Sequence, residues 1–253
     1  DFTRKSVIER GGDPERECLT LIKTRDGKSF LEWEGGYYRM YVFIEDATSY
    51  QIVRNPNDFY ESAVAFGKFA ALLAKFDASQ LYEILPDFHN TKVRYQNFLN
   101  AVEKDIVGRK SAVQKEIDWV NGHSDLCGLI VDKIADGTIP LRVTHNDTKL
   151  NNVMLDNKTG KGIAVIDLDT VMPGSLCYDF GDSIRFGCNP AAEDEPDLSK
   201  VNFRYDLYET YLKGYLSAVG EFITKEEREN LPVGAVLMTY ECGMRFLTDY
   251  LDG

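Results

Sequence analysis

Residues 141–167, LRVTHNDTKLNNVMLDNKTGKGIAVID, carry the most informative pattern of this chain. The first four residues predict a short strand that leads into a polar loop. Residues 153–155 and 162–166 predict two further strands, and the polar turn residues between them indicate a β-hairpin. Because a hairpin returns the chain to its starting point, Asp167 is expected to lie beside Asn152.

Upstream of this segment, a strand pattern gives way to a helix pattern. An antiparallel meander of three strands is predicted at residues 19–24, 28–33 and 37–44. Residues 45–55 interrupt this pattern and predict a connecting segment. Pro56 suits the first turn of a helix, and apolar residues recur at helical spacing from there to Phe76.

Helical patterns dominate the remainder of the chain. They cover, approximately, residues 91–106, 112–135, 178–186, 203–219 and 232–251. Thr224 followed by Glu227 predicts a capping box at the start of a further short helix. The sequence therefore predicts an α+β protein with a small β-rich part at residues 1–45, a linker or hinge at 46–55 and a mostly α-helical lobe at 56–253.

Composition and charge narrow the range of partners. The 253 residues carry a formal charge of −12, and the pI is near 4.8, so neither nucleic acid nor a membrane surface is an expected partner. The five cysteines are odd in number and widely spaced, which favours reduced thiols in a cytoplasmic protein over a zinc site. We find neither a signal-peptide pattern nor an apolar run long enough for a transmembrane helix.

The polar residues of 145–167 match the needs of phosphoryl transfer. This reaction requires a base near the acceptor hydroxyl, oxygen ligands for Mg²⁺ and positive charge near the transferred group. Asp147 suits the base, Asn152 and Asp167 suit the metal, and Lys149 suits the γ-phosphate. His145 is expected to support the loop through hydrogen bonds. If the two acids and the amide were only turn and cap residues, their spacing between short strands would be a coincidence.

These residues also carry a family resemblance. Residues 145–152 resemble the catalytic loop of protein kinases, and more closely that of the aminoglycoside phosphotransferase and choline kinase superfamily. Asp167 stands where that superfamily has its metal-binding aspartate. Within the superfamily, residues 144–155 and 167–185 look like those of the N-acetylhexosamine 1-kinases.

The resemblance implies a protein-kinase-like fold of the aminoglycoside phosphotransferase type, with ATP and Mg²⁺ as cofactors. It implies that the anomeric hydroxyl of an amino sugar, N-acetylglucosamine or N-acetylgalactosamine, is phosphorylated in carbohydrate metabolism. By resemblance, Asp147 deprotonates that hydroxyl, and Asn152 with Asp167 holds Mg²⁺. Asp179 braces the catalytic loop, and Arg245 binds the sugar.

One part of the kinase pattern is not found. Kinase-like folds cover the nucleotide phosphates with a glycine-rich loop upstream of the first strand predicted here. Only eighteen residues precede Leu19, and Gly11-Gly12 lies in a polar stretch that predicts a turn. Residues 1–45 are therefore expected to be the remnant of a truncated N-terminal β-lobe. The chain is expected to be a fragment of a longer enzyme, or else a short form with weak or no ATP affinity.

Several alternatives stay open. One alternative is a kinase whose acceptor is choline, an aminoglycoside or another small alcohol. A non-enzymatic alternative is an inactive sugar-binding protein without an ATP lobe. In an alternative interpretation, Arg245 serves only as an ion-pair partner of Asp249, four residues along the same helix. Sulfatase activity is not expected, because Cys188 is followed by Pro190 but not by the arginine that a sulfatase motif requires at position 192.

Overall fold

The computed structural model describes residues 2–193 and 195–253. The chain forms two compact units of mixed helix and strand. The first comprises the N-terminal residues through Phe76, Lys149–Leu168 and Arg204–Glu221, and the second comprises Asp77–Thr148, Asp169–Phe203 and Phe222–Gly253. The limits of these units do not coincide with the domain bounds predicted at residues 45 and 55, and those bounds stay a prediction. Among the described residues, no helix combines the length and apolarity needed to cross a membrane.

The chain begins with two short helices that the sequence analysis did not predict, α1 (Phe2–Glu9) and α2 (Pro14–Glu17). Asp13 caps α2, because its side chain accepts a hydrogen bond from Glu15 N, and Pro14 occupies the first helical position. The predicted turn at Gly11-Gly12 lies between the helices, with Gly11 at φ 76°. Since Val7 is the only buried residue of α1, this helix has almost no apolar face from which it could be predicted.

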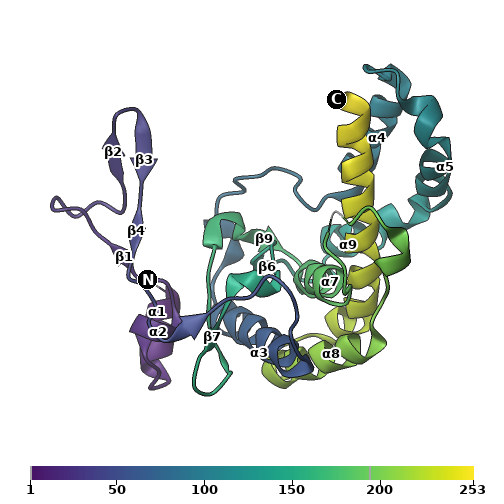
Figure 1. The fold of residues 1–253 in the computed structure, drawn as a ribbon. Helices are drawn as coiled ribbons and strands as arrows, with labels where there is room; N and C mark the ends of the chain where they lie inside the picture. Colours follow the sequence, from purple (N-terminus) through teal and green to yellow (C-terminus); the bar gives the residue numbers. More distant parts are fainter. Residues whose placement is uncertain (1, 194) are drawn as a thin grey trace. The chain divides into compact units, whose positions relative to one another are not determined.

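The next four strands form two nested ladders. They are β1 (Leu21–Ile22), β2 (Leu31–Trp33), β3 (Gly36–Tyr38) and β4 (Met40–Tyr41). β1 pairs with β4 and β2 with β3, both antiparallel (Figure 1). The pairing of the second predicted strand with the third is confirmed by β2 and β3, but the predicted pairing of the first strand with the second is wrong, because β1 pairs with β4 instead. Between β1 and β2 the chain makes its own turn, in which Thr24 N donates to Lys28 O. The inner hairpin turns at Glu34 and Gly35, whose φ angles of 50° and 77° are typical of a tight two-residue turn.

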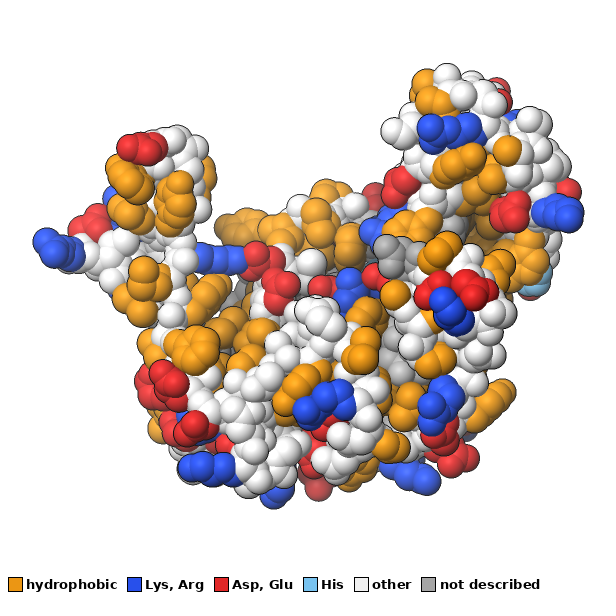
Figure 2. Space-filling view, viewed as in Figure 1, with side chains coloured by type: hydrophobic (Ala, Val, Ile, Leu, Met, Phe, Trp, Pro, Cys, Tyr) orange, Lys and Arg blue, Asp and Glu red, His pale blue; other side chains and the backbone are white. Residues whose placement is uncertain are grey.

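The hairpin of β2 and β3 buries little of its side-chain surface. Figure 2 shows several hydrophobic side chains on its surface, together with acidic and other side chains. Trp33 is 59% exposed and Tyr37 is 72% exposed. The register of this hairpin is therefore set by its turn and its backbone hydrogen bonds, since a buried face is not there to fix it.

A three-stranded sheet in the first unit contains the predicted hairpin. Its strands are β5 (Ala47–Thr48), β7 (Val153–Asp156) and β8 (Gly162–Val165), in the order β5-β7-β8 with antiparallel pairing. The hairpin of β7 and β8 is confirmed. β5 lies within the predicted linker, which is therefore partly a strand: Asp46 O accepts a hydrogen bond from Asn157 N beside it.

Two helices of the first unit pack together beside this sheet, α3 (Pro56–Leu73) and α8 (Tyr205–Val219). The start of α3 is as predicted: Pro56 is the first helical residue, and the Asn55 side chain accepts from Asp58 N at 3.1 Å. Close packing requires a glycine at position 67 of α3, because a Cβ there would lie 2.6 Å from the Ala218 Cβ of α8. The two helices thus form the core of this unit.

The second unit is mainly helical. Its helices and strands are α4 (Thr91–Lys104), α5 (Gln114–Gly122), α6 (Val131–Ala135), β6 (Arg142–Thr144), β9 (Met172–Gly174), α7 (Leu176–Gly187) and α9 (Lys225–Asp252). β6 pairs antiparallel with β9. α7 crosses α9 in direct contact (Figure 1): a Cβ on Gly234 of α9 would lie 2.0 Å from Cys177 O of α7. Across both units, short 3₁₀ helices occur at Ala78–Gln80, Lys110–Val113, Ser124–Gly128, Leu150–Asn152, Leu168–Thr170 and Leu198–Lys200.

The predicted short helix at Thr224 and the predicted helix at 232–251 are one continuous helix, α9. The Thr224–Glu227 capping box is present at its N-terminus. Pro232 lies inside the helix, where a proline normally breaks it, and the packing of α9 against α7 maintains the helix past this point. Glu227 is fully buried and also pairs with Arg142 of β6, with 2.9 Å between Arg142 Nη2 and Glu227 Oε2.

Candidate active site

The loop after β6, which carries the predicted base Asp147, is fixed to α7 through its backbone. Asp179 Oδ2 accepts from His145 N at 2.9 Å, and Asp179 Oδ1 accepts from Asn146 N at 2.8 Å. The buried His145 ring accepts from Asp147 N at 3.3 Å through Nδ1. These contacts tie the loop to α7, and the roles of Asp179 as a bracing acid and of His145 as a supporting residue stay predictions.

Asn146 gives the loop its sharp bend. Its φ angle of 64° lies in the left-handed region, which asparagine tolerates better than most residues. Its side-chain Oδ1 accepts from Thr144 Oγ1 at 3.0 Å, and its Nδ2 donates to Thr170 O at 2.9 Å. Thr170 Oγ1 in turn donates to His145 O at 2.7 Å. The backbone on the N-terminal side of Asp147 is thus held by side chains from both flanking segments.

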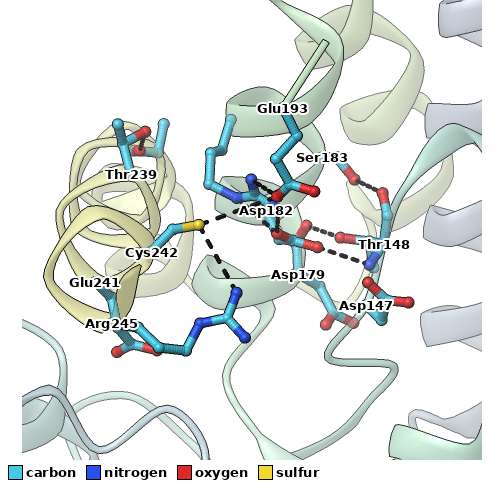
Figure 3. A network of polar contacts seen from close by, with 12 residues as sticks. Asp147, Thr148, Asp179, Asp182, Ser183, Glu193, Thr239, Glu241, Cys242 and Arg245 are labelled. Atoms are coloured by element: carbon cyan, nitrogen blue, oxygen red, sulfur yellow. Dashed lines mark hydrogen bonds and ion pairs between the residues drawn. The ribbon is translucent and has the colours of Figure 1, made fainter. Parts of the chain in front are cut away.

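A second acid of α7, Asp182, holds the loop on the other side of Asp147 (Figure 3). Asp182 Oδ2 accepts from Thr148 N at 3.0 Å, and Ser183 Oγ donates to Thr148 O at 2.7 Å. The sequence analysis did not identify Asp182 or Ser183. The available signal was their spacing: positions three and four after Asp179 lie on the same side of a predicted helix.

The acids of α7 lie in a buried, charged environment. Burial raises the pKa of Asp179, while the hydrogen bonds from His145 N and Asn146 N act in the opposite direction. Arg185 donates to Asp182 Oδ1 through Nε at 3.0 Å and Nη2 at 2.8 Å, and it also pairs with Glu193. Although burial lowers the pKa of Arg185, these carboxylates raise it overall, so that the guanidinium stays charged beside the loop.

The predicted metal-binding residues stand at one end of the hairpin in the first unit. Val153 of β7 is paired with Val165 of β8, and Ile166 N donates to Asn152 O at 2.9 Å. Asn152 and Asp167 therefore lie next to each other at this end, as the sequence predicted. Asp167 has a φ angle of 57°, an uncommon backbone conformation for an aspartate.

The donor chemistry at this hairpin end fits Mg²⁺. Among residues 2–193 and 195–253, no cluster of three or more His, Cys, Asp or Glu side chains forms a metal site. Protein sites for Mg²⁺ commonly supply only one or two carboxylates, with phosphates and waters as the other ligands. The amide of Asn152 and the carboxylate of Asp167 are such a set. Their joint action with Asp147 and Lys149 stays a prediction.

Arg245 lies on the exposed side of α9 in the second unit. In the described part of this helix it makes no ion pair with Asp249. Its Nη2 contacts Cys242 Sγ at 3.9 Å (Figure 3). Its guanidinium lies over the Phe246 ring. It borders a polar pocket of about 330 Å³ between α4 and α9. The other walls of this pocket are formed by Arg94, Asn97, Asn100, Ala101, Lys104, Thr248, Asp249 and Asp252.

Comparisons with known proteins identify the family and the fold of the chain. A sequence profile described as the phosphotransferase enzyme family matches residues 16–219. An aminoglycoside phosphotransferase from Alicyclobacillus acidocaldarius aligns with a TM-score of 0.59 and 11% identity, over 99% of this chain and 81% of that one. A choline kinase from Cryptosporidium parvum aligns with a TM-score of 0.56 and 15% identity, over 98% and 70%. A spectinomycin phosphotransferase in complex with ADP and spectinomycin aligns at 0.52 and 16%, over 94% and 69%.

Since the profile covers most of the sequence, the chain belongs to the phosphotransferase enzyme family. The similar structures identify its fold as the kinase-like α+β fold of that group, as predicted. No disulfide joins the five cysteines, all of which lie among the described residues.

Proposed function

We propose that this protein is an ATP-dependent kinase that phosphorylates the anomeric hydroxyl of an N-acetylhexosamine, as a sugar 1-kinase of carbohydrate metabolism. The main support is the loop after β6, in which the backbone on both sides of Asp147 is bonded to Asp179 and Asp182. Such rigid support suits a catalytic base, because small displacements of a base reduce the rate strongly. A loop that served only as a connection would not need it.

Each residue then has a defined part in the reaction. Asp147 accepts the proton of the acceptor hydroxyl, and the ammonium of Lys149 stabilises negative charge on the transferred phosphoryl group. Asn152 and Asp167 would hold Mg²⁺, which when bound neutralises charge on the ATP phosphates. ATP as the donor is consistent with the ADP named in the spectinomycin phosphotransferase complex.

The pocket beside Arg245 supports an amino sugar as the acceptor. The guanidinium of Arg245 and the side-chain amides of Asn97 and Asn100 offer several donors and acceptors to the hydroxyls and the acetamido group of a neutral sugar. Choline is the second candidate. It needs aromatic rings around its quaternary ammonium, and the described lining of this pocket contains no aromatic residue.

The test is a panel assay of acceptor-dependent ADP release in the presence of Mg²⁺. N-acetylglucosamine, N-acetylgalactosamine, choline and an aminoglycoside are compared, and ³¹P NMR of the product shows whether the phosphate is on the anomeric carbon. We expect turnover only with the two amino sugars. Faster turnover with choline or with the aminoglycoside would reject the proposed acceptor.

Two variants test the proposed roles separately. Asp147→Asn should abolish turnover but leave folding and sugar binding, measured by calorimetry, largely intact. Asp167→Asn should remove the effect of Mg²⁺ on ATP affinity. Sugar binding without any nucleotide binding by the unmodified chain would instead favour the inactive sugar-binding alternative.

A further inference from the structure

The two acids of α7 that hold the loop after β6 do so in different ways. Asp179 uses both carboxylate oxygens on backbone N–H groups of the loop, so the loop itself sets the orientation of this carboxylate. Asp182 gives Oδ2 to the loop, where it accepts from Thr148 N at 3.0 Å (Figure 3). Its Oδ1 accepts from Arg185, from Nε at 3.0 Å and from Nη2 at 2.8 Å. The direction in which Asp182 presents Oδ2 therefore depends on Arg185.

Arg185 is itself held by more than its bonds to Asp182. Its Nη1 pairs with Glu193 Oε1, in the segment that follows α7. The Cys242 thiol of α9 lies 4.0 Å from the same Glu193 oxygen. The side chain of Arg185 is 12% exposed and that of Asp182 is 8% exposed, so water competes little for this ion pair. The guanidinium is thus held through all three of its nitrogens, which the single nitrogen of a lysine cannot reproduce.

The orientation of the Asp182 carboxylate matters for the proposed base. The terminal torsion of an aspartate has only a broad preference, so hydrogen bonds and packing decide how the carboxylate is turned. Without the guanidinium, a rotation of the Asp182 carboxylate would misalign Oδ2 with the Thr148 N–H, and hydrogen bonds weaken steeply as alignment is lost. Because Thr148 immediately follows Asp147 in the chain, the change would reach the backbone of the base directly.

We propose that Arg185 is a positioning residue for phosphoryl transfer: through Asp182 and Thr148 N it fixes the backbone that carries Asp147. This inference rests on the proposed function, because it takes Asp147 as the base. Arg185 acts on the position of the base and not on the binding of the nucleotide. Its loss should therefore lower kcat and leave the KM for ATP unchanged.

Steady-state kinetics of two variants test this role, with the acceptor that the unmodified protein phosphorylates. Arg185→Gln should lower kcat at least about tenfold, with a change of less than about twofold in the KM for ATP. Arg185→Lys keeps a charged donor for Asp182 and should recover part of the loss. Arg54→Lys is the matched control, because Arg54 also pairs with a buried aspartate, Asp58 of α3, at 2.8 Å. The kcat of this control should equal that of the unmodified protein.

A double-mutant cycle shows whether Arg185 acts through Asp182. Asp182→Asn should lower kcat on its own. If Arg185 works through this carboxylate, adding Arg185→Gln to Asp182→Asn should lower kcat by less than about threefold more. Losses that multiply in the double variant would overturn the proposed route. The double variant also lacks the unpaired buried charge that Arg185→Gln alone leaves, so the comparison with Asp182→Asn holds even where the single arginine variant does not fold.

Amide hydrogen exchange of the full chain, followed by NMR without nucleotide, tests the structural link independently of turnover. In folded Arg185→Lys, the Thr148 N–H should exchange at least about tenfold faster than in the unmodified protein, whereas that of Leu237, buried in α9, should not change. Unchanged exchange at Thr148, equal acceleration at both sites, or an unchanged kcat in the folded Arg185 variants would overturn the proposal. If Thr148 responds but the unmodified protein phosphorylates no acceptor, the proposed function is wrong and the catalytic role of Arg185 falls with it, while the structural link stands.

Discussion

Replacing Asp179 by asparagine should loosen the catalytic loop in a measurable way. In the structure each carboxylate oxygen accepts one backbone N–H, from His145 at 2.9 Å and from Asn146 at 2.8 Å. Asparagine keeps a single acceptor oxygen, and its amide group would face the second N–H donor to donor. A lost hydrogen bond to a charged acceptor is worth about 1.5–3 kcal/mol, and the buried N–H left unpaired adds to this loss.

We therefore expect Asp179→Asn to lower the free energy of unfolding by about 3 kcal/mol, measured by urea denaturation. Because the affected N–H groups immediately precede Asp147, kcat should also fall by at least about tenfold under conditions where the variant is fully folded. Asp118→Asn is a suitable control, since it makes the same change at an exposed position of α5 in the same unit.

Equal free energies of unfolding for Asp179→Asn and Asp118→Asn would refute this reasoning. If Asp179→Asn unfolds within about 0.5 kcal/mol of the unmodified protein, as surface substitutions usually do, the two backbone bonds do not stabilise the loop. If stability falls but kcat is unchanged for the folded variant, Asp179 supports the fold alone and does not position the base.

Three further predictions concern the packing and the thiols of the second unit. Gly234→Ala should destabilise the protein by about 3 kcal/mol in urea denaturation, because the new Cβ would lie 2.0 Å from Cys177 O. Gly243→Ala on the same helix should instead stabilise the protein by about 1 kcal/mol, because its Cβ would meet nothing within 4 Å. Equal effects of the two substitutions would contradict the close helix contact. Burial raises the pKa of the Cys177 thiol to about 12, so this thiol should not react with iodoacetamide at pH 8 until the protein unfolds. The half-buried Cys242 should be modified under the same conditions, and peptide mass spectrometry distinguishes the two sites. Thr224→Ala should cost about 1 kcal/mol in thermal unfolding through loss of the capping box, and a cost near zero would show that the packing of α9 alone fixes its start.

Local signals in the sequence predicted the parts of the fold that depend on neighbouring residues. Pro56 marked the start of α3, and the turn residues between β7 and β8 marked the hairpin. The nested ladders of the N-terminal strands were not predicted, because pairing between β1 and β4 is a choice between distant partners that propensity does not make. The continuity of α9 past Pro232 was missed for a similar reason, since tertiary packing outweighed a local helix breaker.

In the candidate site, too, local features were predicted and contacts between distant residues were not. The residue types and spacing of 145–167 predicted the loop and the hairpin end at Asn152 and Asp167, and Asp179 was placed by resemblance. Asp182 was not predicted, because its role depends on which side chains of α7 meet a loop more than thirty residues earlier in the sequence.

Glu227 has two partners at once, and this restricts which residues can replace it during evolution. Its side chain accepts from Thr224 N at 2.8 Å, and the same carboxylate binds Arg142 at the start of the strand that leads to Asp147. Glutamine could close the cap but would deprive the half-buried guanidinium of Arg142 of this counter-charge, and aspartate is one carbon too short to reach both partners. A substitution at position 227 would therefore be tolerated only together with a change at position 142. The two positions are expected to vary as a pair among related sequences.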